Sequence, residues 1–325
     1  MVRPRVYLTR ELPAEPMRLL RERTVLTMNA EDRPATRDEL LAGVRDAEGL
    51  LCMLSDTLDA AVMDAAPSLK GVANYAVGYN NIDLAAAAER GIVVTNTPGV
   101  LTDATADLAF ALLLAASRRI VEGDALVRSG RWRGWGPVQL LGADLAGATL
   151  GIVGAGRIGR AVARRARGFD MHVLYWNRHR LAADDETVLG VHFAELDDLL
   201  SRSDVVSLHV ALAAETRHLI DAARLGRMKP TAVLVNTARG AVVDEAALAR
   251  ALADGTIAAA GLDVYEHEPR VEPTLLTLPN VVLAPHLGSA AIGTRTRMGV
   301  MAVENVLAAC QGRTPPNVVD MDSTD

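Results

Sequence analysis

The sequence predicts an α/β protein with two doubly wound domains, each a parallel sheet covered by helices on both faces. Short apolar runs alternate with helical segments along the chain, a rhythm that is typical of parallel sheets. In the stretch 148–159, an apolar strand leads into a glycine-rich turn and a helix. The length of 325 residues is too great for one ordinary core and fits two domains.

The composition argues against several classes of protein. A formal net charge of −6 disfavours a nucleic-acid binder, whose binding surface is normally basic. The two cysteines, Cys52 and Cys310, stand in apolar surroundings, so we expect buried thiols in a reducing compartment and neither a disulfide framework nor a metal site. No apolar signal-peptide core is present, and the longest apolar run, 108–116, is too short for a bilayer. We expect a soluble, cytoplasmic protein with no membrane association.

The first 99 residues predict the first sheet. The expected strands are 5–9, 24–28, 49–54, 71–74 and 92–96, and the expected helices are 15–23, 37–47, 58–66 and 84–90. The loop 76–81 follows a strand at its carboxyl end, where ligands bind in open α/β sheets. An ordinary turn rich in glycine and asparagine is the alternative.

Residues 97–99 mark the crossing into a second domain. A helix over 103–120 is expected next, apolar around most of its circumference, which places it either centrally or in a subunit interface. The following segment, 131–137, contains Trp132 and Trp135 and shows little periodicity. We expect it to pack against another surface.

The stretch 148–159 carries the pattern Gly154-x-Gly156-x-x-Gly159 between a strand and a helix, and a second strand at 171–175 completes a βαβ unit. Gly154 permits a tight turn, Gly156 lets the backbone approach a pyrophosphate, and Gly159 lets the helix lie close to the strand. The amino-terminal N–H groups and the dipole of that helix face the anion. This context predicts a dinucleotide site.

The remaining chain continues the same alternation. The expected helices are 195–200, 221–227, 245–254 and 288–312, and the expected strands are 205–209, 232–236, 258–264 and 281–285. The last helix is long enough to return to the first domain.

The end of the second strand bears on the choice of cofactor. NAD preference normally comes from a carboxylate at this position, which binds the ribose 2′-hydroxyl. Here the position is Asn177, followed by Arg178 and Arg180, and an arginine fork can bind a 2′-phosphate. We therefore predict NADP(H) over NAD(H), with NAD(H) still possible. The alternative is that both arginines are solvated surface charges.

Three motifs follow later strands, at 236–240, 263–269 and 285–289. In a parallel sheet they share the edge that holds the dinucleotide, so one arginine, one carboxylate and one histidine can meet a nicotinamide ring. Each has an ordinary alternative: an interdomain salt bridge for Arg239, a structural histidine for His286. On the residues alone, Glu266 and Glu272 compete with Glu268 as the working carboxylate.

With these motifs and the loop at Val77-Gly78, the chain resembles the D-isomer-specific 2-hydroxyacid dehydrogenases over nearly its whole length. It is most similar to the glyoxylate/hydroxypyruvate reductase branch, judged from residues 74–79, 99–108 and 236–240. The resemblance implies a flavodoxin-like substrate domain of residues 1–99 plus 287–325, with a Rossmann domain of residues 100–286 inserted. It also implies a homodimer held through the 103–120 helix region and the 131–141 segment.

The resemblance assigns site residues as well. The implied catalytic residues are Arg239, Glu268 and His286. The expected cofactor contacts are Thr105, Gly154, Gly156, Arg157, Ile158, Gly159, Asn177, Arg178, Arg180, His209, Thr237, Ala238, Asp263 and Gly288. The expected substrate contacts are Leu54, Val77, Gly78, Trp135, Arg239 and Ser289. The implied reaction is the NADPH-dependent reduction of a small 2-oxo acid, glyoxylate or hydroxypyruvate, to the D-2-hydroxy acid.

Other activities are less consistent with the sequence. No basic residue lies between Lys70 and Arg90, where a phosphorylated acid would need one, and Val77 replaces a lysine of the similar phosphite dehydrogenases. By resemblance, Trp135 reaches the neighbouring subunit's pocket and favours small acids; simple interface packing is the alternative. A dehydrogenase for larger 2-oxo acids is the second candidate. A non-catalytic dinucleotide sensor, similar to the related corepressors, is disfavoured because all three catalytic positions are filled.

Overall fold

The computed structural model describes residues 3–29 and 31–319. The chain forms two compact units, and the second interrupts the first. Unit 1 comprises the chain up to Leu101 and from Ala290 onward, and unit 2 comprises Thr102–Ser289. Each unit contains one sheet with parallel strands throughout, so the predicted α/β class is confirmed.

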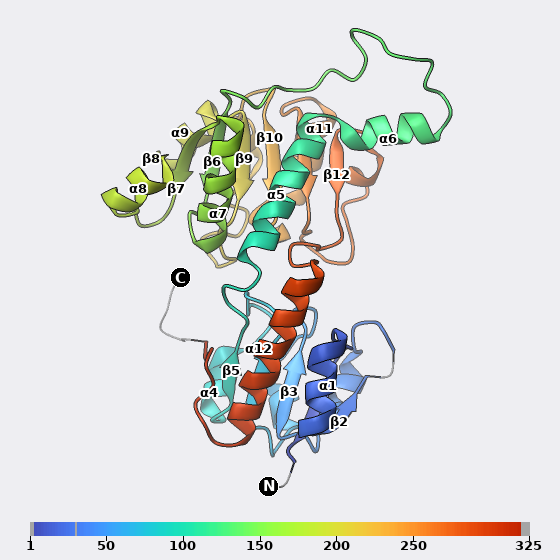
Figure 1. Cartoon of the computed structure of the whole chain (residues 1–325), viewed down its shortest axis with the longest axis vertical. Coiled ribbons are helices and arrows are strands. Elements are labelled where there is room, and N and C mark those ends of the chain that lie inside the picture. The colour runs from blue at the N-terminus through green and yellow to red at the C-terminus, as the bar shows by residue number, and fades with distance from the viewer. Residues whose placement is uncertain (1–2, 30, 320–325) are drawn as a thin grey trace. The chain divides into compact units, whose positions relative to one another are not determined.

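Unit 1 has a five-stranded sheet in the order β2-β1-β3-β4-β5 (Figure 1). Its strands are β1 (Arg5–Leu8), β2 (Val25–Met28), β3 (Gly49–Cys52), β4 (Gly71–Asn74) and β5 (Val93–Thr95). Its helices are α1 (Ala14–Arg23), α2 (Arg37–Gly43), α3 (Ala60–Asp64), α4 (Leu84–Glu89) and α12 (Ile292–Cys310). The last helix of the chain therefore belongs to the same unit as the first strands, as the length of the expected helix 288–312 allows.

Helices cover both faces of this sheet. Side chains of α2, α3 and α4 form one core with the strands, and those of α1 and α12 form the other. Successive strand residues alternate between the two cores: Tyr7 joins the first, and its neighbours Val6 and Leu8 join the second. Strands buried on both faces explain why the first half reads as continuous apolar runs.

Unit 2 has a seven-stranded sheet in the order β12-β11-β10-β9-β6-β7-β8. Its strands are β6 (Thr149–Val153), β7 (His172–Trp176), β8 (Val191–Phe193), β9 (Val205–Leu208), β10 (Val233–Asn236), β11 (Ala259–Leu262) and β12 (Val281–Leu283). Its α-helices are α5 (Thr102–Ser117), α6 (Ile120–Arg128), α7 (Arg157–Ala166), α8 (Ala183–Leu189), α9 (Leu196–Arg202), α10 (Ala222–Leu225) and α11 (Glu245–Ala253). Short 3₁₀ turns are η1 (Arg167–Phe169), η2 (Gly240–Val242) and η3 (Leu275–Thr277).

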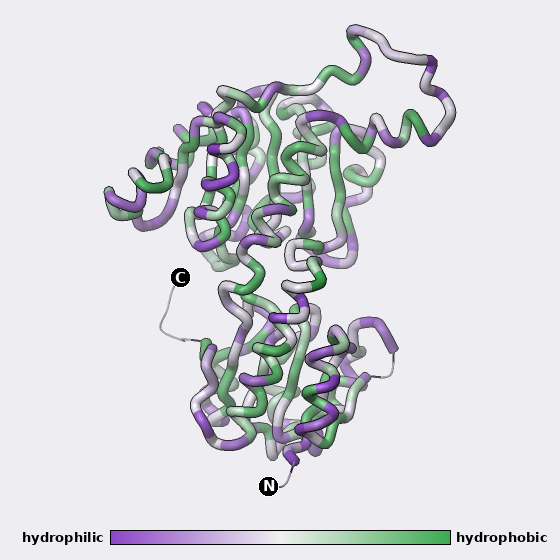
Figure 2. Tube along the Cα trace, in the orientation of Figure 1, coloured by the Kyte–Doolittle hydropathy of each residue, from purple (hydrophilic) through white to green (hydrophobic). Residues whose placement is uncertain are grey.

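The two faces of this sheet also have separate cores. One contains residues of α5, α7 and α8, and the other contains residues of α9, α10 and α11. In Figure 2 the strands are mostly green, whereas green and purple alternate along α7, as expected for a helix with one face on the sheet. The strand order reverses at β6, which pairs with β7 on one side and β9 on the other. The loops after β6 and β9 flank this switch point, where doubly wound sheets bind ligands.

Some elements differ from the sequence prediction. The helix expected over 103–120 ends earlier, at Ser117, as α5. Arg119 adopts a left-handed conformation with φ of 53°, and a separate helix, α6, starts after it. The guanidinium of Arg119 pairs with Glu122 at 2.7 Å, which holds the start of α6. Helix α8 and strand β8 were not expected at all; both are short, and β8 lies at the sheet edge. No helix in the described part of the chain is long and apolar enough to cross a membrane.

Candidate active site

The glycine turn after β6 has the geometry that its sequence demands. Gly154 has a φ of 100°, and a Cβ there would lie 2.7 Å from the Val210 nitrogen. A Cβ at Gly156, in contrast, would meet no atom within 4 Å, so this backbone is open to a ligand. Helix α7 begins at Arg157 and Ile158 without a side-chain cap, which leaves its first N–H groups for an anion.

The expected ribose-binding position lies directly beside this turn. Asn177 follows β7, and its Oδ1 accepts a hydrogen bond from the Ala155 N–H at 2.6 Å. Arg178 continues the same turn. Arg180 is paired with Glu186, with nitrogen–oxygen distances of 2.7 and 2.8 Å. Glu186 therefore compensates part of the charge that Arg180 could offer to a phosphate.

Glu186 is the centre of that small cluster. The Tyr175 hydroxyl donates to the same carboxylate at 2.5 Å, and Arg180 also lies over the Phe193 ring. The hydrogen bonds from Arg180 and Tyr175 lower the pKa of Glu186 to about 2, so its charge is kept at neutral pH. Sequence reasoning did not identify Glu186, because nothing in its local pattern distinguishes it from the other acidic residues of α8.

Two other expected cofactor residues follow strands on the β9 side of β6. The imidazole of His209 bonds to the Ser207 hydroxyl at 2.8 Å, and burial lowers its pKa to about 3, so the ring is neutral. Thr237, after β10, has a buried hydroxyl with no hydrogen-bond partner among the described residues. A buried hydroxyl without a partner is costly, and a bound ligand that hydrogen-bonds to it would remove that cost.

Two expected cofactor residues form hydrogen bonds within the protein. The Thr105 hydroxyl donates to the Gly288 carbonyl at 3.1 Å. The Asp263 carboxylate accepts the N–H groups of Leu287 and Gly288 at 2.6 and 2.8 Å, and burial raises its pKa despite these bonds. In this structure, Asp263 anchors the turn that carries His286.

His286 and Glu268 form a hydrogen-bonded pair. Nδ1 of His286 lies 2.9 Å from one Glu268 oxygen, and the other oxygen accepts the Tyr265 N–H at 3.1 Å. Burial alone would raise the pKa of Glu268, but the hydrogen bond and charge of His286, together with the Tyr265 N–H and the charge of Arg239, leave the pKa lowered. The carboxylate thus fixes the orientation of the imidazole from its Nδ1 side.

The structure distinguishes the three candidate glutamates. Only Glu268 contacts His286. Glu266 instead pairs with Arg217 at 2.7 Å and with Nε2 of His218 at 2.8 Å. The Glu272 side chain accepts the Thr274 hydroxyl at 3.2 Å.

Arg239 lies on the turn after β10, next to this pair. The Asn236 side chain holds the turn: its amide donates to the Arg239 carbonyl at 2.9 Å, and its oxygen accepts the Ala238 N–H at 3.0 Å. Burial lowers the pKa of Arg239, and the charge of Glu268 opposes this effect. A Cβ at Gly240 would lie 1.8 Å from the Tyr265 carbonyl carbon, so the two turns are packed backbone against backbone. Arg239, Glu268 and His286 are therefore gathered at one edge of the sheet.

The expected substrate residues of unit 1 lie on loops braced by asparagines. Asn74 donates to the Gly78 carbonyl and Asn96 donates to the Val77 carbonyl, each at 2.8 Å. Leu54 follows β3 and is 37 % exposed. In unit 2, Ser289 is the last residue of the unit, and Trp135 is 85 % exposed in the single chain.

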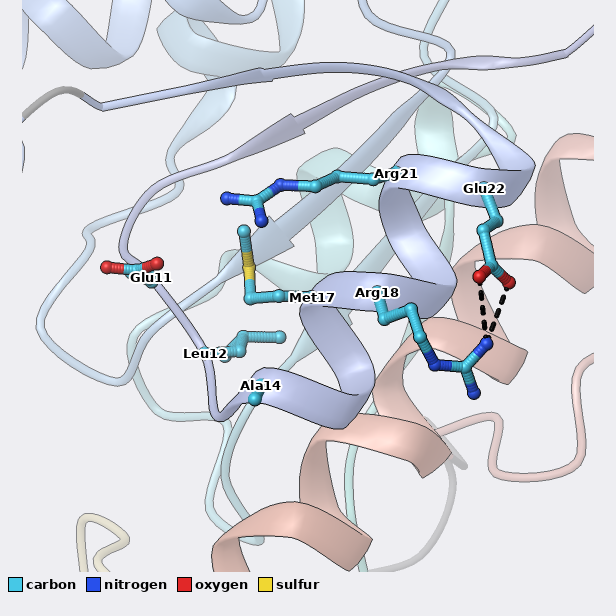
Figure 3. Close-up of a pocket in the computed structure, with 7 residues that line it drawn as sticks. All are labelled: Glu11, Leu12, Ala14, Met17, Arg18, Arg21 and Glu22. Atoms are coloured by element: carbon cyan, nitrogen blue, oxygen red, sulfur yellow. Dashed lines mark hydrogen bonds and ion pairs between the residues drawn. The ribbon is translucent and has the colours of Figure 1, made fainter.

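A cavity of about 460 Å³ lies elsewhere in unit 1 (Figure 3). It is lined by Glu11, Leu12 and residues of α1, and Arg21 extends over Met17 toward Glu11. None of the expected site residues lines it.

Comparisons with known proteins agree with the motifs. Residues 110–288 match the family described as D-isomer specific 2-hydroxyacid dehydrogenase, NAD binding domain. The chain is 52 % identical to a glyoxylate reductase from Korarchaeum cryptofilum (strain OPF8), covering 99 % of this chain and 97 % of that one.

Solved structures give the same picture. A glyoxylate reductase from Paecilomyes thermophila superposes with a TM-score of 0.87 at 36 % identity, covering 99 % of this chain and all of that one. An NADPH-dependent glyoxylate/hydroxypyruvate reductase from Sinorhizobium meliloti, in complex with NADP and malonate, superposes with a TM-score of 0.85 at 37 % identity, covering 98 % and 97 % of the two chains. The chain therefore belongs to the D-isomer specific 2-hydroxyacid dehydrogenases, within the glyoxylate reductase branch, and is an NAD(P)-dependent oxidoreductase acting on the CH–OH group.

Proposed function

We propose that this enzyme reduces glyoxylate, hydroxypyruvate or both to the D-2-hydroxy acid, with NADPH as the preferred reductant. The observation that carries the proposal is the pairing of His286 with Glu268 at 2.9 Å, beside the turn that carries Arg239. The names of the relatives, glyoxylate reductases that cover nearly the whole chain, support the substrate class. When bound, the reduced nicotinamide supplies the hydride.

We assign proton transfer to His286. Glu268 holds Nδ1, so Nε2 is the nitrogen that donates a proton to the substrate carbonyl oxygen as the carbonyl carbon is reduced. In the reverse direction the same nitrogen accepts the hydroxyl proton. Glu268 keeps the imidazole in its orientation through the hydrogen bond to Nδ1.

We assign substrate binding to Arg239. Its planar guanidinium matches the carboxylate of a 2-oxo acid and sets which face of the carbonyl receives the hydride. Its positive charge also favours the negative charge that develops on the carbonyl oxygen. Partial burial strengthens both effects, because water screens the charge less there.

The preference for NADPH rests on Asn177. A neutral side chain at this position does not repel a 2′-phosphate, and Arg178 and Arg180 follow it. The pairing of Arg180 with Glu186 reduces the benefit from that arginine. NADH remains a usable second cofactor in this proposal.

We further propose that the enzyme works as a homodimer in the cytoplasm. The exposed apolar side chains of α6 and of segment 131–141 support the dimer, and the free, buried Cys52 and Cys310 fit a reducing compartment. In the dimer, Trp135 limits the size of the substrate that the site accepts.

The first experiment is a reduced-nicotinamide absorbance assay of purified enzyme. It crosses NADPH and NADH with glyoxylate, hydroxypyruvate, phenylpyruvate and 3-phosphohydroxypyruvate. We expect the fastest turnover with NADPH and the two small acids. Faster turnover of phenylpyruvate would favour a dehydrogenase for larger acids, and binding of dinucleotide without turnover of any acid would favour a sensor.

A further inference from the structure

The segment that carries Glu268 is held by a buried carboxylate that the reaction itself does not use. Residues 263–274 form no helix or strand, so their N–H groups need other partners. Glu245, the first residue of α11, is 8 % exposed, and its carboxylate is the partner of two of these N–H groups. One of its oxygens accepts the Glu266 N–H and the other accepts the Glu272 N–H, each at 2.6 Å.

These two bonds lie on either side of Glu268 in the chain. Charge-assisted bonds of this length are about twice as strong as neutral ones, and burial of Glu245 protects them from water. Residues 266 and 272 are therefore tied to α11, a helix that packs in the core of unit 2. The backbone between residues 266 and 272, which includes Glu268, is thus restrained at both ends.

Two further contacts hold the same segment. The backbone of Tyr265 and Glu266 lies against Gly240, where no Cβ would fit. The Glu266 side chain is paired with Arg217 and His218. Of all these contacts, only those of the Glu245 carboxylate hold both residue 266 and residue 272.

We propose that Glu245 is a positioning residue for the Glu268–His286 pair. It acts through the backbone of residues 266 and 272, and its effect on catalysis is exerted by keeping the Glu268 carboxylate on Nδ1 of His286. This inference rests on the proposed function, because it assigns Glu245 a part in the same proton transfer.

The test is the variant Glu245→Gln. An amide offers one acceptor oxygen and one donor nitrogen, so one of the two backbone N–H groups would face another donor. We expect kcat for glyoxylate to fall by roughly 10- to 100-fold, the cost of a small misplacement of a catalytic group. The KM for glyoxylate and the Kd for NADPH should stay within about two-fold of wild type, since neither binding contact changes.

Hydrogen exchange provides a readout that does not depend on activity. Amides of the peptide 264–274 should exchange several-fold faster in Glu245→Gln, whereas the glycine turn at 151–160 should exchange as in wild type. Glu245→Asp keeps the charge at the helix start but is one methylene shorter, and we expect it to lie between wild type and Glu245→Gln in both measurements. If Glu245→Gln does not fold, Glu245→Asp takes its place in both measurements.

The matched control is Asp244→Asn. Asp244 caps α11 by accepting the Ala247 N–H at 2.9 Å, and asparagine caps equally well. This variant removes the same charge one residue away without touching the 266–272 stretch, so it should behave as wild type. Unchanged kcat in Glu245→Gln, or an equal loss in Asp244→Asn, would overturn the inference. Absence of turnover by the wild type would instead overturn the proposed function, and the exchange measurement would still decide whether Glu245 orders this segment.

Discussion

At the scale of single residues, the lowered pKa of Glu268 makes the stability of the fold depend on pH. Its pKa is lowered in the folded chain because the hydrogen bond and charge of His286, with the Tyr265 N–H and the charge of Arg239, together outweigh the effect of burial. A carboxyl group whose folded pKa is depressed contributes stability above its unfolded pKa, about 4.3 for glutamate, and loses it as the pH falls through the folded value. The pairing of Glu268 with His286 therefore stabilises the fold at neutral pH and not in strong acid.

The variant Glu268→Gln tests the contribution of the Glu268–His286 pair. At neutral pH we expect a lower Tm than wild type and a kcat reduced by about 100-fold, since the imidazole loses its charged partner. The difference in Tm should shrink as the pH falls below about 4. Thermal melts across this range give the answer, with the exposed Glu215→Gln as the control. A difference in Tm that is constant with pH would contradict the assignment.

The choice of cofactor is decided at Asn177. The variant Asn177→Asp places a carboxylate where the 2′-phosphate of NADPH would bind and where the 2′-hydroxyl of NADH can be accepted. We expect the ratio of kcat/KM for NADPH to that for NADH to fall by about ten-fold or more, because like charges repel in a partly buried site. The same two rates, measured for Arg178→Ala, should show a loss with NADPH alone. An unchanged ratio in both variants would remove the basis for the NADPH preference.

At the scale of elements, the approach of two turns brings Arg239 and Glu268 together. A Cβ at Gly240 would lie 1.8 Å from the Tyr265 carbonyl carbon, and backbone cannot rotate aside as a side chain would. We expect Gly240→Ala to lower the free energy of unfolding by about 1–3 kcal/mol and to lower kcat. Gly168→Ala is the control, since a Cβ there meets no atom within 4 Å. Equal stability of the two variants, measured by denaturant unfolding, would contradict the close approach.

The elements also show what a sequence can and cannot predict. The buried strands and the glycine turn were predictable, because apolar runs, glycine spacing and strand ends are local signals. The grouping of 236–240, 263–269 and 285–289 followed from the rule that parallel strands share one carboxyl edge. The break at Arg119 and the bonds of Glu245 and Glu186 were not predictable. A left-handed arginine has no sequence signature, and a buried glutamate at the start of a helix looks like one that favours the helix dipole.

At the scale of the whole molecule, large apolar side chains are exposed on α6 and on the segment 131–141 of unit 2. Trp135 is 85 % exposed, Val138 79 %, and Leu141 64 %, and α6 adds Ile120 and Val127, each more than half exposed. Large apolar side chains that occur together on a surface are typical of protein interfaces. This is the stretch through which we propose that two chains associate.

The variant Val138→Asp tests that association. A charge placed on an apolar contact must be desolvated when two chains meet, so we expect the dimer to weaken and the mass from sedimentation to shift toward one chain. Val188→Asp is the matched control: Val188 is 73 % exposed on α8, outside this stretch, and its replacement should leave the mass unchanged. A wild-type protein that sediments as a single chain at micromolar concentration would contradict the dimer.

If the wild type is a dimer, the variant Trp135→Ala distinguishes the two roles proposed for that side chain, a limit on substrate size and packing in the interface. Faster turnover of phenylpyruvate relative to glyoxylate identifies Trp135 as the limit on substrate size, whereas unchanged selectivity with a weaker dimer identifies an interface residue alone.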